Sequence, residues 1–193
     1  MTLGENKKIA LGLIEEYSKT NINLTDDEDI ATRLNFLYAT SYQELSQNKK
    51  ILKTMVMREI SEETLEGYSE YELPNDMYQF KCLIGLDKNN NNVNVPFKPI
   101  GKDIILISNE VDAKVILEYY AYPTVITENT KDDFELEIDQ DVQLILPYAV
   151  ANDVLKTDPS SDYAAFYAEY KRKLETLDTR TTVPTVAIEE GIL

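Results

Sequence analysis

The sequence holds few side chains suited to nucleophilic or metal chemistry. It contains no histidine among its 193 residues, which excludes Ser-His-Asp and Cys-His nucleophile systems, the usual zinc ligand sets and the commonest general base. The one cysteine, Cys82, alternates with Tyr78, Phe80 and Ile84 on one face of an expected strand. We therefore expect a buried core thiol rather than a reactive one. A single cysteine cannot form an intrachain disulfide, in keeping with folding inside a cell.

Carboxylates are abundant and are the remaining candidates for chemistry. A glycan hydrolase would use a carboxylate pair. Glu118 and Asp139 are candidates, but no motif surrounds either of them, so solvated surface acids are the favoured interpretation. The acidic run at residues 25–29 lacks the glycine and glutamate spacing of an EF-hand, and we interpret it as a helix N-cap with first-turn acids. Nothing locates the apolar cavity of a small-ligand module. We expect no enzyme activity and no catalytic, cofactor-binding or metal-binding residues.

The charge balance is strongly acidic, with 35 acidic against 19 basic residues and a net charge of −16. No stretch concentrates Lys and Arg with interleaved aromatics, so tight DNA binding is not expected. An acidic surface is compatible with a conduit through which DNA slides, because like charge repels the phosphate backbone. No run has the apolar length of a signal-peptide core or a membrane span, so we expect a soluble chain that is not secreted by the usual route.

The elements that would position these residues are helical towards both ends of the chain. Apolar residues at spacing four predict a helix over residues 9–17, and a longer stripe predicts a second over residues 30–45. A third is predicted over residues 142–155, with Pro147 either in its first turn or at a kink. The fourth covers residues 161–177, and the last two are expected to form a hairpin.

The centre has the shorter period of strands, at residues 51–60, 68–73, 77–86, 93–97, 103–107 and 114–122. The asparagines at 89–92 predict an exposed hairpin tip. Residues 128–141 carry seven acids and one lysine, which favours a solvated connection with helix-capping acids over an ion site. The predicted fold is α+β. It has a single domain over residues 1–178, in which helices within 5–46 and 140–178 form a bundle with an antiparallel β-rich insertion at 50–123.

The last stretch, residues 179–193, has no helical period and too few apolar residues for a core of its own. Its alternation suits an extended arm that adds to a partner, and disorder is the equal alternative. Pro184 would favour an edge or an extended loop. The candidate partner-binding residues are Thr181, Val183, Pro184, Val186, Ile188, Ile192 and Leu193.

Three passages carry a resemblance to a known family. Residues 68–78 combine tyrosines, Pro74 and Asp76 before a long strand, and residues 104–107 and 115–122 are apolar strands, the second ending on aromatics. Residues 144–171 run from Leu146-Pro147-Tyr148 through an Ala-rich helix and Asp158-Pro159 into a long helix. This order resembles the head-to-tail adaptor (connector) family of tailed bacteriophages, which includes tail tubular proteins.

The resemblance implies a structural role in the virion neck, at the interface between head and tail, after assembly in the host cytoplasm. The implied partners are further copies in a ring of about twelve subunits, the portal protein and the next neck or tail protein. Viral DNA would pass through the ring without specific binding. The arm would be the portal-binding segment. A tail terminator, a stopper and a minor capsid protein are the alternatives within the virion.

Overall fold

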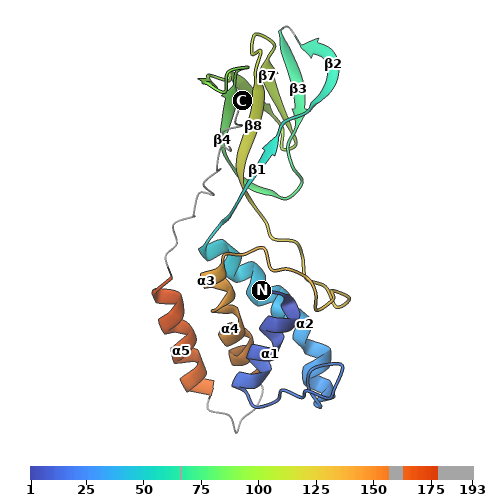
Figure 1. Ribbon diagram of the computed structural model, residues 1–193, viewed down its shortest axis with the longest axis vertical. Helices are drawn as coiled ribbons and strands as arrows, with labels where there is room; N and C mark the ends of the chain where they lie inside the picture. The colour runs from blue at the N-terminus through green and yellow to red at the C-terminus, as the bar shows by residue number, and fades with distance from the viewer. Residues whose placement is uncertain (66, 157–162, 178–193) are drawn as a thin grey trace, which may run out of the picture. The chain divides into compact units, whose positions relative to one another are not determined.

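The computed structural model describes residues 1–65, 67–156 and 163–177, with the backbone alone over residues 61–65. These residues divide into two compact units. Unit 1 is Met1–Ile51 with the described residues of Ala121–Thr179, and unit 2 is Leu52–Tyr120. Unit 1 is built from helices and unit 2 from antiparallel strands (Figure 1), so the predicted α+β class is confirmed. The single domain over residues 1–178 and the arm boundary at residue 179 stay predictions.

Unit 1 contains α1 (Leu3–Leu13), α2 (Glu28–Asn48), α3 (Gln140–Gln143), α4 (Leu146–Leu155) and α5 (Tyr163–Glu175). Helix α4 packs against α1, α2 and α5, and Figure 1 shows α5 beside α4. Helices from both halves of the chain share one core of buried side chains, which includes Leu3, Leu11, Leu34, Tyr38, Tyr42, Leu45, Val142, Leu146 and Val150. The apolar stripes of helices far apart in sequence therefore complete one another.

Helix α1 differs from its prediction in both position and buried face. It begins at Leu3 because Thr2 and Glu5 form a capping box, in which the Thr2 N–H donates to Glu5 Oε2 at 2.8 Å and the Glu5 N–H donates to Thr2 Oγ1 at 3.2 Å. It ends at Leu13, so the predicted extension to residue 17 is wrong. Ile9, placed on the predicted apolar stripe, is 40% exposed.

The other helices follow the sequence more closely. Helix α2 begins inside the predicted acidic cap, where Asp27 Oδ1 accepts from the Ile30 N–H at 3.0 Å. The predicted helix over residues 142–155 is broken into α3 and α4. Pro147 lies in the first turn of α4, where its missing N–H has no helical partner to lose, so the first of its two predicted positions is confirmed.

Unit 2 contains β1 (Ile51–Val56), β2 (Glu59–Leu65), β3 (Tyr68–Glu72), β4 (Met77–Leu86), β5 (Asn92–Val93), β6 (Phe97–Ile100), β7 (Ile104–Ser108) and β8 (Lys114–Ala121). They form two four-stranded sheets, ordered β1-β8-β4-β5 and β2-β3-β7-β6. Antiparallel ladders join β3 to β2 and β7, and β6 to β7. The predicted single strand over residues 51–60 is wrong, because β1 and β2 belong to different sheets.

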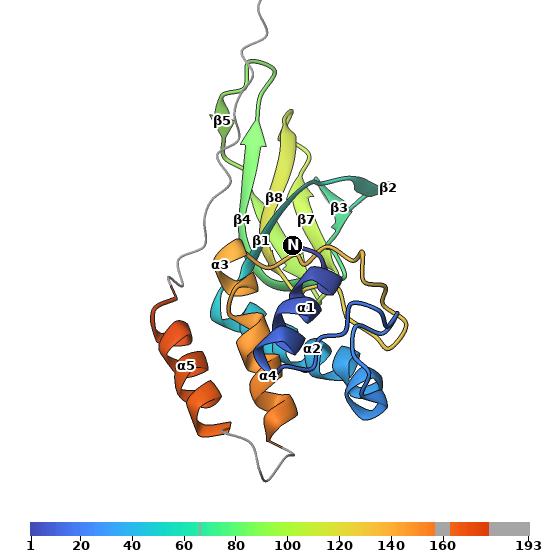
Figure 2. The same cartoon turned by 60° about the horizontal axis from the view of Figure 1, so that its bottom comes forward.

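The asparagine-rich turn joins the strands labelled β4 and β5 in Figure 2, as the predicted hairpin tip requires. Asn89 to Asn92 are exposed, and Asn90 has a φ of 60°, the left-handed geometry that asparagine tolerates. Asp87 Oδ1 accepts from the N–H groups of Asn89 and Asn91 at 2.7 and 2.8 Å. These hydrogen bonds hold the pKa of Asp87 below its usual value. The tip is therefore organised by one carboxylate rather than by burial.

The acidic connection, which we call the strap (residues 124–141), is not the solvated linker that its composition predicted. It buries Ile126, Leu136 and Ile138 in the core of unit 1. Its backbone is bound by α1, because the N–H groups of Leu3 and Gly4 donate to the carbonyls of Phe134 and Asp132, each at 2.8 Å. Phe134, Leu136 and Ile138 pack against the helices, while Glu135 and Glu137 between them are exposed.

A side chain of α2 fixes the start of the strap. Asn35 Nδ2 donates to the carbonyls of Thr127, Glu128 and Thr130 at 3.1, 2.9 and 3.3 Å. Further along, the Glu137 N–H donates to Tyr42 Oη at 2.8 Å. The strap is thus an ordered layer of unit 1, held by hydrogen bonds as well as by burial.

Candidate functional site

The predicted partner-binding residues Thr181, Val183, Pro184, Val186, Ile188, Ile192 and Leu193 lie outside the described residues. The prediction that residues 179–193 bind a partner therefore stays a prediction.

The two carboxylates considered for catalysis belong to different units, and each pairs with a lysine of its own unit. Glu118 on β8 accepts from Lys81 Nζ at 2.8 Å. Asp139 at the end of the strap accepts from Lys49 Nζ at 2.9 Å. The hydrogen bond to Glu118 is the main reason that the pKa of Lys81 is raised. Both carboxylates therefore have a partner of opposite charge within their own unit.

Cys82 lies beside the same carboxylate. Its Sγ is 3.5 Å from Glu118 Oε2, and the residue is partly rather than fully buried, so the predicted complete burial is wrong. Burial and the negative charge of Glu118 raise the pKa of the thiol. A raised pKa disfavours the thiolate, which is the reactive form of cysteine. The surroundings of Cys82 thus favour an unreactive thiol.

The end of the strap is clamped by a buried lysine. Lys49, whose side chain is 7% exposed, places Nζ 2.9 Å from Asp139 Oδ2 and 2.8 Å from Asp141 Oδ2. Burial alone would lower the pKa of Lys49, but the hydrogen bonds to the two carboxylates outweigh it and the pKa is raised. Within the described residues, no group of three or more acidic or cysteine side chains is arranged to hold a metal ion. Asp139 and Asp141 therefore bind the ammonium group of Lys49.

A buried polar network joins α1, α2, α3 and the strap within unit 1. Asn6 of α1 donates through Nδ2 to the Gln143 carbonyl at 2.8 Å and accepts from Tyr38 Oη at 3.0 Å. Gln143 Nε2 donates to the carbonyls of Leu136 and Ile138 at 3.0 and 2.7 Å. Burial raises the pKa of Tyr38, so its hydroxyl stays a donor at neutral pH. These bonds fix the position of the strap and α3 and offer no accessible reactive group.

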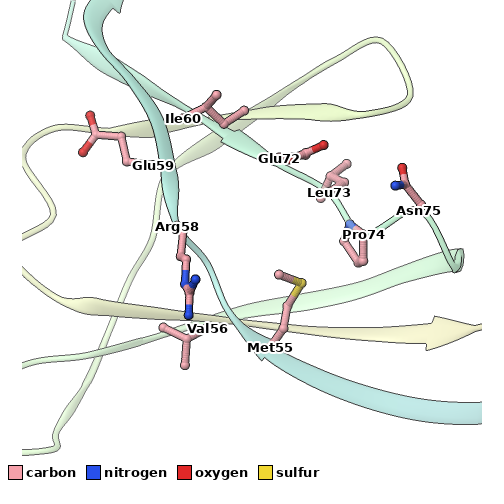
Figure 3. A pocket seen from close by; sticks show the side chains of 9 residues that line it. All are labelled: Met55, Val56, Arg58, Glu59, Ile60, Glu72, Leu73, Pro74 and Asn75. Carbon is pink, nitrogen blue, oxygen red and sulfur yellow. The ribbon is translucent and has the colours of Figure 1, made fainter.

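Unit 2 contains a cleft of about 670 Å³. Its lining comes from the end of β1, the start of β2 and the turn after β3: Met55, Val56, Arg58, Glu59, Ile60, Glu72, Leu73, Pro74 and Asn75. In Figure 3, Met55, Leu73 and Pro74 lie together and Glu59 points away from them. The lining therefore combines apolar side chains with three charged ones, Arg58, Glu59 and Glu72.

This lining suits an apolar side chain of a partner better than a reacting small molecule. Val56 and Ile60 are 45% and 51% exposed, and the lining includes no serine, cysteine or tyrosine that could act as a nucleophile. Apolar hollows with a polar rim are typical of docking sites between proteins. Sequence reasoning missed this cleft, because residues 51–60 have no glycine, proline or asparagine to mark the break between β1 and β2 that opens it.

More apolar side chains are exposed elsewhere on unit 2. Tyr78, Phe97 and Ile100 are 46%, 41% and 44% exposed. The ring of Phe97 also packs against Phe80, with centroids 5.3 Å apart. Exposed aromatic and aliphatic side chains on the same unit as an apolar cleft favour an interaction surface over a solvated one.

No protein-family model matches this chain, and no curated protein matches it in sequence. Among the helices that the structure describes, none is both long and apolar enough to cross a membrane. The function therefore has to be argued from the units and surfaces themselves.

Proposed function

We propose that this chain is a structural subunit of a tailed-phage virion, namely a head-to-tail adaptor that joins the portal to the tail and surrounds the DNA exit channel. In this proposal, unit 1 is the helical bundle of the adaptor, unit 2 is its inserted β region, and residues 179–193 form an extended arm that binds the portal. The protein acts by assembly and has no enzymatic role.

The insertion topology is the observation that carries the proposal. Helices from the two ends of the chain share one core, and the antiparallel sheets are formed by the residues between them. This is the order of elements that the resemblance implies. The passage with the most specific resemblance contributes the helical core, since Leu146 and Val150 of α4 are fully buried.

The exposed surfaces also support a role in assembly. The apolar cleft and the exposed aromatics of unit 2 provide contact area for protein partners. The carboxylates suggested by sequence for catalysis are paired with lysines instead. The net charge of −16 suits a channel wall that DNA slides past without adhering.

Stoichiometry and partner test the proposal. The purified full chain, alone and mixed with portal rings of the same virus, would be measured by native mass spectrometry. We expect a complex with about twelve copies per portal ring. About six copies bound to tail tubes instead would favour a tail terminator, and a chain that binds neither portal nor tail components would overturn a neck function altogether.

Truncation after Asp178 tests the arm separately. We expect the truncated chain to keep its circular dichroism spectrum, because the described core of unit 1 contains no residue beyond Leu177. It should no longer dock on portal rings in the same mass measurement. A truncated chain that docks like the full chain would place the portal contact elsewhere.

A further inference from the structure

The cleft of unit 2 offers apolar contact area that the described residues leave open. Its apolar lining consists of Met55, Val56, Ile60, Leu73 and Pro74. Figure 3 shows Met55, Leu73 and Pro74 close to one another. Val56 and Ile60 are about half exposed, so these two side chains have room for a further apolar group.

The charged groups of the lining favour an uncharged occupant. Arg58, Glu59 and Glu72 are its charged members, and all three are exposed. Because both signs are present, the lining gives little net attraction for a segment of either charge. An extended apolar segment without charge therefore suits this cleft better than a charged one.

The arm, residues 179–193, contains such a segment. Residues 181–188 read Thr-Thr-Val-Pro-Thr-Val-Ala-Ile and carry no charged side chain. Alternate side chains of an extended chain share one face, so Pro184, Val186 and Ile188 would lie together. This face of the arm is wholly apolar and complements the apolar lining of the cleft.

Strand β2 adds main-chain groups beside the cleft, since Glu59 and Ile60 at its start both belong to the lining. It is the first strand in the order β2-β3-β7-β6, and within the described part of the chain no strand pairs with its other edge. An open edge binds an extended segment through main-chain hydrogen bonds. Pro184 is compatible with this position, because an added edge strand can point a missing N–H towards solvent.

The chain leaves α5 at the same end of unit 1 from which β1 starts. Lys173, near the end of α5, places Nζ 4.5 Å from the centre of the Tyr148 ring in the first turn of α4. Lys49, just before β1, binds Asp141 of α3, the short helix that precedes α4. The end of α5 and the start of β1 therefore both lie near the junction of α3 and α4.

The arm is long enough to reach the cleft of its own chain. Ile51, the first residue of β1, and Leu177 both pack against the core of unit 1. Between Ile51 and Met55 of the cleft, β1 rises by only about 13 Å. An extended chain spans up to about 30 Å between Leu177 and Val186. The length of chain beyond α5 therefore suffices for a contact within one copy.

We propose that the arm of the free subunit docks in the cleft of unit 2 of its own chain, with Val186 and Ile188 covering Val56 and Ile60. The contact goes beyond the proposed function, because it assigns the arm a site before any partner is bound. One consequence rests on that function: when the portal binds the arm, the cleft is uncovered for the next neck protein. The arm thus keeps an apolar surface covered until assembly.

Hydrogen exchange on the full-length chain tests the contact. The main-chain amides of residues 58–60 should exchange about tenfold or more slowly in the full chain than in the chain truncated after Asp178. Val186→Asp should abolish this protection, because it places a carboxylate against apolar side chains. Val183→Asp, on the opposite face of an extended arm, is the matched control and should keep the protection. Equal exchange in the full and truncated chains, or equal behaviour of the two variants, would overturn the contact.

Disulfide trapping identifies the copy that supplies the arm. With the one native cysteine removed by Cys82→Ser, Val56→Cys and Val186→Cys should form a disulfide within the monomer. The control pair, Val56→Cys with Ala187→Cys, should oxidise about tenfold or more slowly, because residue 187 is on the other face of an extended arm. Crosslinked dimers that increase with protein concentration would place the arm in a second copy and overturn the contact within one chain.

The oxidised chain also separates this contact from the adaptor function. It should no longer dock on portal rings in the native mass measurement, since its arm is held in the cleft. An oxidised chain that docks like the reduced one would overturn the role of the arm in portal binding and leave the cleft contact intact.

Discussion

Replacing Lys49 by methionine should cost unit 1 about 2 kcal/mol of unfolding free energy. Removing one partner of a fully buried ion pair costs about 3–5 kcal/mol. In this case Asp139 and Asp141 are 43% and 44% exposed, so water solvates part of the charge that Lys49 leaves behind. That exposure lowers the expected loss to about 2 kcal/mol. The measurement is the urea midpoint at pH 7, with the slope of the transition unchanged.

A control at an exposed lysine separates the effect of burial from the effect of ion pairing. Lys88 binds Asp112 at 2.7 Å, the same geometry as the Lys49 bonds, but these side chains are 81% and 84% exposed. We expect Lys88→Met to leave the urea midpoint unchanged, because an exposed pair is screened by solvent. If Lys49→Met costs no more than Lys88→Met, the strap is not held by its ion pairs and the argument from burial is wrong.

The Lys49 clamp also has a defined pH dependence. The folded pKa of Lys49 is raised above the ordinary value of 10.5. Its stabilisation is therefore fully present below the unfolded pKa and is lost as pH rises through the folded pKa. The stability difference between wild type and Lys49→Met should stay constant through neutral pH and shrink only above pH 10.5. A difference that vanishes near neutrality would contradict the assignment to this ammonium group.

Three further substitutions test other contacts, each by urea unfolding. Tyr42→Phe should cost about 1 kcal/mol at pH 7, because it removes the acceptor for the Glu137 N–H. Burial raises the pKa of Tyr42 from 10.0 to about 12. The unfolding free energy of the wild type should therefore fall as pH rises through this range, and that of the variant should not show this fall. Gly4→Ala should cost about 2 kcal/mol, since its Cβ would lie 2.7 Å from the strap, whereas Gly12→Ala meets nothing within 4 Å and should not destabilise. Replacing residues 89–92 by Asn-Gly should change stability by less than about 0.5 kcal/mol, and a larger loss would place the tip at a contact.

Local signals in the sequence predicted most helices and strands, but not the breaks between neighbouring ones. The strand alternation and the turn at Pro74 predicted β3 and β4 closely, because turn residues and period-2 patterns are local. The sequence did not predict the break between β1 and β2, because Met57 extends the apolar residues Met55 and Val56 beyond the end of β1. The start of α1 was missed although Thr2 and Glu5 have the capping-box spacing.

The prediction of a solvated linker is wrong for the strap, because it followed the number of acidic residues and not the alternation of apolar ones. Phe134, Leu136 and Ile138 alternate with acids, the pattern of an extended segment with one buried face. Attention to that alternation would have predicted burial, whereas the number of acids favoured a solvated linker. The lysine partners of those acids lie far away in sequence, so only the folded chain identifies them.

The discontinuous composition of unit 1 sets the order in which the chain can mature during translation. Unit 2 consists of consecutive residues, Leu52–Tyr120, so all its strands are available once the ribosome has passed them. Helices α1 and α2 are made earlier but lack their core partners until the strap and α4 emerge. The apolar faces of these two helices therefore stay uncovered while the hundred or so residues up to the end of α4 are synthesised, which takes roughly 5–20 s. We therefore expect nascent chains to pass through a stage with a folded β region and an open helical core, which would be the stage most exposed to aggregation.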